Sequence, residues 1–139
     1  MDIDKLQAVL NRYSSPLNAD EYIKACRKYP ADMCKIYVGV MTHESRLCTA
    51  FYKPEVEKNY YNCGGWKSAE ILRTKRADSN GSWLRKFDSY AHFYEVVLES
   101  FHRLYWEQGL KTPETIVNKY VGKYSQNWVD TINNIKNKL

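Results

Sequence analysis

Apolar positions in this chain recur mainly at helical spacing, most clearly across residues 31–46. On a helix drawn at about 100° per residue, five apolar side chains share one face: Met33, Ile36, Tyr37, Val40 and Met41. Glu44 falls in the middle of that face, whereas Lys35 and Thr42 occupy the far side, where we expect solvent. The pattern predicts a helix over residues 31–46 that carries one carboxylate in an apolar setting.

A carboxylate in an apolar setting is costly unless it is paired or neutral. Burial disfavours the charged form and raises the pKa, which is how a glutamate becomes a general acid near neutral pH. On spacing alone, two structural interpretations of Glu44 stay open. Its side chain can reach solvent at the end of the helix, or it can pair with a buried arginine.

The same periodicity predicts further helices over residues 2–13, 18–29, 89–108, 112–120 and 127–139. Four of them begin at residues with side-chain oxygens that can accept hydrogen bonds from the first turn: Asn18, Ser89, Thr112 and Asn127. Asn18 is followed three residues later by Glu21, as in a capping box. These boundaries predict a mainly helical fold.

Residues 47–66 have neither a helical nor an alternating period. Within this segment, residues 59–66 (Asn-Tyr-Tyr-Asn-Cys-Gly-Gly-Trp) look like an aromatic loop bent by two glycines. Two short runs then flank an Asn-Gly pair at residues 80–81, which predicts a β-hairpin over residues 70–87. We therefore predict one mainly α (α+β) domain over residues 1–139 with one small hairpin.

Charge and length narrow the classes of partner. The 139 residues include 21 basic and 16 acidic side chains, a net charge of +5 that favours an anionic cell-wall polymer, nucleic acid or membrane surface. We find no aromatic-basic RNA motif and no zinc finger.

No apolar run approaches the ~20 residues that span a bilayer, so no membrane span is expected. The N-terminus lacks a signal-peptide layout, so release by other means or removal of a leader is expected.

The four cysteines allow three disulfide connectivities. A Cys48–Cys63 bond would tie the end of the Glu44 helix to the glycine loop, and a Cys26–Cys34 bond would staple two helices. Buried free thiols are the alternative. The spacing does not resemble a zinc site, and we expect neither a metal nor a cofactor.

The order of several short motifs resembles the lysozyme-like superfamily. The first motifs are His43-Glu44-Ser45, the Asn/Gly loop, and the hairpin that ends in Lys-Phe-Asp-Ser-Tyr at residues 86–90. They are followed by the segment 112–122, which begins with Thr-Pro-Glu-Thr and ends with Gly122, and by Asn-Trp-Val at residues 127–129. The chain looks most like the endo-β-N-acetylglucosaminidase and lytic transglycosylase branch, over residues 36–135. The Gly-Leu-Met-Gln motif of soluble transglycosylases is absent after Glu44, so that subfamily is not assigned.

The resemblance implies a lysozyme-like helical domain that cleaves β-1,4 bonds between N-acetylmuramic acid and N-acetylglucosamine in peptidoglycan. It maps the family's catalytic acid onto Glu44 and its cleft-floor residues onto Asn62 and Gly64. The family's tyrosine maps onto Tyr124, with Tyr120 as the other choice.

The aromatic loop supplies candidate sugar contacts by its own composition. Tyr60, Tyr61 and Trp66 have no periodic core role, and flat aromatic rings stack on sugars. The structural alternative is ordinary packing. Trp128, by contrast, shares a helical register with core positions, and we expect it to pack in the core.

A second carboxylate would complete a glycosidase, because hydrolysis of a glycosidic bond commonly uses two. The sequence offers Glu55, Glu57, Glu70, Asp78 and Asp88, and Glu70 and Asp78 on the hairpin are the expected candidates. Each is also explained as a solvated charge. Without a second carboxylate, the acetamido or 6-hydroxyl group of the substrate would act, and the 6-hydroxyl would make the enzyme a lytic transglycosylase.

The sequence therefore predicts a bacteriolytic glycosidase of phage or bacterial origin, in a virion or released to the cell wall or periplasm. Its expected partners are peptidoglycan glycan strands and other virion or lysis proteins, with no nucleic acid. The alternative is a catalytically inactive glycan-binding or virion structural module on the same fold. A basic nucleic-acid-binding helical domain is a third, weaker class, which predicts salt-sensitive binding.

Overall fold

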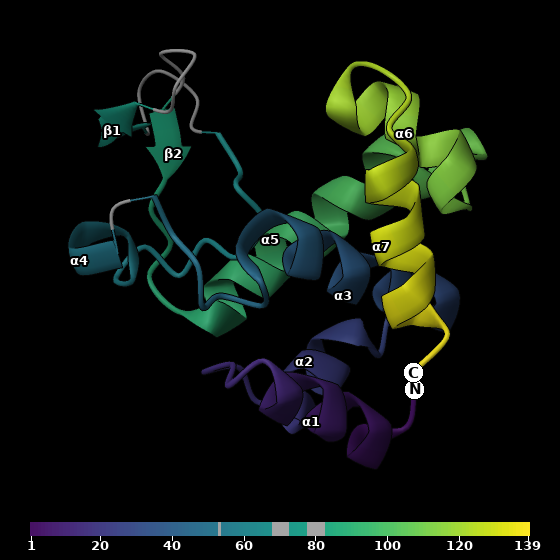
Figure 1. Ribbon diagram of the computed structural model, residues 1–139, viewed down its shortest axis with the longest axis horizontal. Coiled ribbons are helices and arrows are strands. Elements are labelled where there is room, and N and C mark those ends of the chain that lie inside the picture. Colours follow the sequence, from purple (N-terminus) through teal and green to yellow (C-terminus); the bar gives the residue numbers. More distant parts are fainter. Residues whose placement is uncertain (53, 68–72, 78–82) are drawn as a thin grey trace.

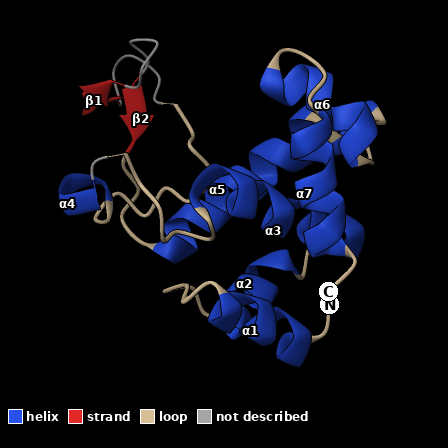
Figure 2. Cartoon of the chain, in the orientation of Figure 1, coloured by secondary structure: helices blue, strands red, loops and turns tan. Residues whose placement is uncertain are grey.

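The computed structural model describes residues 1–52, 54–67, 73–77 and 83–139, and this part of the chain is mainly helical, as predicted (Figures 1 and 2). In chain order its elements are α1 (Ile3–Arg12), α2 (Ala19–Cys26), α3 (Ala31–Ser45), α4 (Pro54–Glu57), β1 (Arg73–Ala77), β2 (Trp83–Arg85), α5 (Tyr90–Leu104), the 3-10 helix η2 (Trp106–Gln108), α6 (Pro113–Val121) and α7 (Gln126–Lys136). In Figure 1 the strands and α4 lie on one side of α3 and α5, and α6 and α7 lie on the other.

Helix α3 forms the centre of the core, and it is buried on more than the predicted face. The far side of the helix is not solvated: Cys34 and Val38 are fully buried, and Thr42 is only 5% exposed. The Thr42 hydroxyl donates a hydrogen bond to the carbonyl of Val38, one turn earlier. The expectation of a solvated far side was wrong because helices pack against α3 from several directions.

The closest of these neighbours is α7, which makes the most extensive contact with α3. A side chain at Gly39 would place its Cβ 2.8 Å from the Cα of Ile132, well inside van der Waals contact. Gly39 therefore allows the backbones of α3 and α7 to approach closely. The predicted core stripe at the C-terminal end of the chain is buried: Trp128, Ile132, Ile135 and Leu139.

Three of the four predicted helix caps are confirmed. Asn18 accepts a hydrogen bond from the amide of Glu21, Ser89 from that of His92, and Thr112 from that of Thr115. Each satisfies an amide in the first turn that has no partner within the helix.

The fourth predicted cap and the predicted ends of two helices, α5 and α2, were wrong. The cap of α7 is Ser125, whose hydroxyl accepts from the amide of Trp128, and the predicted cap, Asn127, lies inside the helix. Helix α5 ends at Leu104, and a short 3-10 helix follows before Gly109 adopts a left-handed conformation. In α2, regular helix ends at Cys26, earlier than predicted.

The two strands pair antiparallel, with Arg73 opposite Arg85, Ala77 opposite Trp83 and an irregularity between these pairs. Residue Lys67 forms an isolated antiparallel bridge with Leu84 of β2. The predicted Asn-Gly turn lies outside the described residues, as do both expected second carboxylates, Glu70 and Asp78.

All four cysteines form disulfides, Cys26 with Cys34 and Cys48 with Cys63, so the alternative of free thiols does not hold. The first bond joins the end of α2 to the first turn of α3. The second joins the chain just beyond α3 to the glycine loop, with 4.8 Å between the Cα atoms.

Candidate active site

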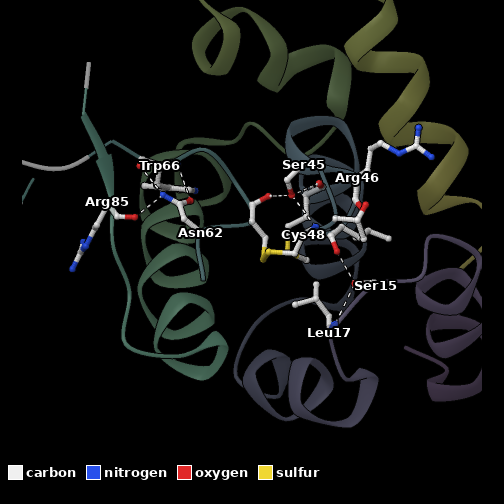
Figure 3. The surroundings of a disulfide bond; sticks show 12 residues. Ser15, Leu17, Ser45, Arg46, Cys48, Asn62, Trp66 and Arg85 are labelled. Atoms are coloured by element: carbon white, nitrogen blue, oxygen red, sulfur yellow. Dashed lines mark hydrogen bonds between the residues drawn. A yellow bond between two sulfur atoms is a disulfide. The ribbon is translucent and has the colours of Figure 1, made fainter. Parts of the chain in front are cut away.

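The end of α3 places Glu44 at the molecular surface, where the chain turns sharply. Arg46, Leu47 and Cys48 follow it with positive φ angles of 49°, 56° and 69°. Three consecutive non-glycine residues in this conformation are strained, and such strain persists only where the surroundings hold it. The Ser45 hydroxyl provides part of that hold, because it accepts from the amide of Cys48 and donates to the carbonyl of Cys63 (Figure 3).

Asn62 holds the glycine loop in shape. Its side-chain amide donates to the carbonyls of Trp66 and Arg85, and its oxygen accepts from the amide of Trp66, each at 2.9–3.0 Å (Figure 3). One buried side chain therefore closes the loop and ties it to β2. The Cys48–Cys63 disulfide fastens the same loop to the end of α3.

The two glycines let this loop approach Glu44 and the core helix. A Cβ at Gly64 would lie 2.6 Å from the hydroxyl oxygen of Tyr37, and a Cβ at Gly65 would lie 3.4 Å from Oε2 of Glu44. Gly65 also has a φ of +65°, which favours glycine. The Tyr37 hydroxyl accepts a 2.7 Å hydrogen bond from the indole of Trp66, so the loop is bonded directly to α3.

A cleft of about 510 Å³ opens between this loop and the C-terminal helices. One wall consists of residues of α3 and the loop: His43, Glu44, Gly64, Gly65, Trp66 and Lys67. The other consists of residues from the end of α5 to the start of α7: Leu104, Tyr105, Tyr120, Val121, Ser125 and Trp128. The described part of the cleft lining thus combines one acid with several aromatic rings, a composition that suits sugar binding.

A smaller hollow of about 160 Å³ adjoins Glu44 on another side. It shares Glu44 and Gly65 with the cleft, and its remaining lining residues come from the α3 end, α4, the loop and β2: Ser45, Ala50, Phe51, Tyr52, Glu57, Asn62 and Leu84. Glu44 and Gly65 are therefore common to both spaces.

The environment of Glu44 favours its neutral form. Burial raises the pKa of Glu44 above its usual range, although its side chain keeps 29% of its exposure. His43 opposes this rise, with Nδ1 at 3.8 Å from Oε1 of Glu44, and Lys67 and the Trp128 indole oppose it more weakly. Desolvation is the largest contribution, so the pKa stays raised.

Tyrosine and tryptophan rings line the second wall of the cleft, the one that runs from the end of α5 to the start of α7. The rings of Tyr105 and Tyr120 have centroids 5.7 Å apart, and those of Tyr120 and Trp128 are 5.5 Å apart. The Tyr120 hydroxyl donates a long 3.5 Å hydrogen bond to the carbonyl of Gly64 across the cleft. Burial, followed by the nearby Tyr37 and Glu44, raises the pKa of Tyr120 well above its ordinary value.

The structure brings some of the predicted sugar-contact residues together. Gly64 and Trp66 line the cleft beside Glu44, and Asn62 lines the adjoining hollow. Tyr60 is buried and lines neither space. Tyr61 also lies outside them and packs edge-on against Tyr90, with ring centroids 5.0 Å apart.

The mapped tyrosine lies in a different place from its alternative. Tyr124 is 50% exposed, does not line the cleft, and donates its hydroxyl hydrogen bond to Gln126. Tyr120 lies in the cleft wall. Sequence spacing left both open because the two residues are only four positions apart across the end of α6.

Several lining residues were not anticipated from the sequence. Lys67, Tyr105 and Ser125 carry no motif, and Trp128 was expected only as a core residue, although it both packs in the core and lines the cleft. Glu57 was one of five candidates for the second carboxylate, and no spacing in the sequence gave a reason to prefer it. No periodicity marks it, because the four-residue helix α4 that carries it was not predicted.

Another hollow of about 440 Å³ lies between α2 and α5, lined by the ring of Tyr29 and by charged side chains that include Glu21 and Glu95. Of these two carboxylates, Glu95 is exposed and Glu21 is half-buried. In the described ranges, no group of three or more acidic, histidine or cysteine side chains could hold a metal ion.

Comparison with known proteins adds no family assignment. No protein-family model, curated protein or solved structure matches the chain. None of the helices among the described residues is long and apolar enough to cross a bilayer.

Proposed function

We propose that the protein is a peptidoglycan glycosidase that cleaves β-1,4 bonds between N-acetylmuramic acid and N-acetylglucosamine, with Glu44 as the general acid. The observation that carries this proposal is the position of Glu44: a partly buried carboxyl group, with a raised pKa, shared by a cleft and an adjoining hollow. Protonation of the leaving glycosidic oxygen needs a carboxyl group that is still protonated near neutral pH.

The cleft supports a sugar-binding role. It has a volume of about 510 Å³ and lies directly beside Glu44, so sugar units have room to bind there. The rings of Trp66 and Tyr120 provide apolar surface for sugar faces. The net charge of +5 favours approach to an anionic wall polymer.

The resemblance to the lysozyme-like superfamily supports the same conclusion. It implies a catalytic glutamate at the end of a buried helix, with an Asn/Gly loop beside it. Glu44, Asn62 and Gly64 meet in this way around one cleft and its hollow. The two disulfides suit an oxidising location such as the periplasm or the cell wall.

The test of the proposed function is Glu44→Gln, which keeps the shape of the side chain but removes the acid. We expect the wild-type protein to clear a suspension of purified cell walls, and the variant to lose at least ~100-fold in rate, as removal of a general acid does. Glu55→Gln is the matched control, because the Glu55 side chain is 89% exposed and lies outside both spaces.

An unchanged rate for Glu44→Gln would overturn the proposal. If the wild-type protein binds cell walls but never cleaves them, the alternative of an inactive glycan-binding or virion structural module holds instead.

A further inference from the structure

A second carboxylate lies beside the hollow that adjoins Glu44. Among the described residues that line the cleft or the hollow, Glu57 is the only acid besides Glu44. It belongs to α4, an element distinct from the helix that carries Glu44. Two carboxyl groups on separate elements therefore border one space.

The position of Glu57 is unusual for a charged residue. Glu57 is 3% exposed, whereas the side chain of Glu55, two residues earlier on the same short helix, is 89% exposed. Glutamate is almost never buried to this degree unless its surroundings engage the carboxylate. Its burial indicates that the surrounding residues hold this side chain in place at the edge of the hollow.

Backbone hydrogen bonds fix the segment that carries Glu57. The carbonyl of Glu57 accepts from the amide of Tyr60 at 2.9 Å, and the carbonyl of Tyr60 accepts from the amide of Phe87 at 2.8 Å. Phe87 is fully buried in the core beyond β2. The wall formed by Glu57 is thus tied to the same scaffold that holds the glycine loop.

The hollow has room for water. A single water needs on the order of 10–15 Å³, so a space of about 160 Å³ holds several. A general acid and a second carboxylate with a water between them form the arrangement by which inverting glycosidases hydrolyse their substrates.

We propose that Glu57 is the second catalytic carboxylate and that it acts as general base on a water in this hollow. The inference rests on the proposed function. Glu44 donates its proton to the glycosidic oxygen, and the bond from that oxygen to the anomeric carbon breaks with its electron pair on the oxygen. The water oxygen forms a new bond to the anomeric carbon as Glu57 takes a water proton, which leaves a reducing end and a free hydroxyl. Exchange with solvent then returns a proton to Glu44 and removes one from Glu57.

This assignment makes the enzyme a hydrolase. In a lytic transglycosylase the 6-hydroxyl of the sugar would attack, and the product would carry a 1,6-anhydro end. A digest with only 1,6-anhydro ends would therefore exclude this role of Glu57 without any substitution, whereas reducing ends show that water is the attacking group.

The test combines analysis of the products of the wild-type protein with the kinetics of substituted variants. Purified peptidoglycan digested by the wild-type protein in ¹⁸O-water is expected to give reducing ends that carry ¹⁸O by mass spectrometry. Glu57→Gln is expected to lose at least ~100-fold in kcat with little change in KM, as loss of a general base does. Glu55→Gln is the control and should stay within about twofold of wild type, as expected for a solvated charge outside the site. Circular dichroism and the unfolding midpoint verify that each variant is folded.

A second variant separates chemistry from packing. Glu57→Ala should regain part of its rate in molar formate, because a small carboxylate can enter the vacated space, whereas Glu44→Gln should not. Glu70→Gln and Asp78→Asn test the two acids expected from the sequence.

Two results would overturn the role of Glu57 while leaving the glycosidase intact. One is a folded Glu57→Gln variant that keeps activity while Glu44→Gln, Glu70→Gln or Asp78→Asn loses it. The other is a wild-type digest that contains only 1,6-anhydro ends, which decides the matter even if Glu57 variants do not fold. Failure of the proposed function itself looks different, because the wild-type protein would then release no glycan product.

Discussion

The indole N–H of Trp66 donates a hydrogen bond to the hydroxyl of Tyr37, with 2.7 Å between nitrogen and oxygen. Tyr37 is fully buried in α3, two turns before Glu44, and Trp66 stands in the cleft wall that also contains Glu44. This single bond ties the glycine loop to the helix that carries the proposed acid. Gly64 makes it possible, because a Cβ there would collide with the same hydroxyl.

Tyr37→Phe removes the acceptor of this bond while keeping the ring. We expect the free energy of unfolding to fall by about 1–2 kcal/mol, because the half-buried Trp66 indole donor loses its partner. We also expect the folded variant to clear cell walls more slowly than the wild-type protein, because the loop is released from α3. Denaturant unfolding and a turbidity assay measure the two effects.

Tyr124→Phe is the matched control for that experiment. Its hydroxyl bonds only to Gln126 at the surface among the described contacts, so both readouts should stay near wild type. Equal activity of Tyr37→Phe and wild type would show that the loop keeps its position without the bond.

The pH dependence of activity should follow the protonation of Glu44. Burial raises the pKa of this carboxyl group, so it stays protonated to a higher pH than an exposed glutamate, and activity should fall as pH rises through that pKa. His43 is the strongest group that lowers the pKa of Glu44. His43→Gln removes this influence, so the basic limb of the pH–rate profile should move to higher pH.

His102→Gln is the control for the pH experiment, because His102 pairs with Glu107 away from the cleft. Its profile should match that of the wild type. A basic limb that does not move in His43→Gln, or that moves to lower pH, would contradict the assignment of this limb to Glu44.

The two disulfides should differ in their effect on activity. Cys48–Cys63 closes 15 residues and Cys26–Cys34 closes 8, and loss of either should cost roughly 2–4 kcal/mol of stability. Only the first fastens the glycine loop beside Glu44.

Paired serine variants test this difference well below their unfolding temperatures. Cys48→Ser/Cys63→Ser should lose most cell-wall activity, whereas Cys26→Ser/Cys34→Ser should keep most of it. Equal retention of activity by both folded variants would show that the loop does not depend on its covalent tie.

The sequence predicted features that depend on local chemistry. The caps at Asn18, Ser89 and Thr112 are local because each oxygen meets an amide a few residues away. The apolar spacing around Glu44 predicted its helix, and the glycine pair predicted a bent loop. Such signals need no knowledge of the rest of the fold.

Features that depend on distant packing were not predictable. Thr42 is buried because helices cover both sides of α3, which one helix's periodicity cannot show. The choice between Tyr120 and Tyr124 depends on where α6 ends relative to the cleft. The position of Glu57 depends on a four-residue helix whose sequence has no period to read.

The most direct test of the central claim is mass spectrometry of the glycan fragments released from purified peptidoglycan. We predict that the wild-type protein creates new chain ends at the β-1,4 bonds between N-acetylmuramic acid and N-acetylglucosamine, and that Glu44→Gln creates them at least ~100-fold more slowly. Release of peptides alone, or the same new glycan ends from Glu44→Gln at the wild-type rate, would contradict it.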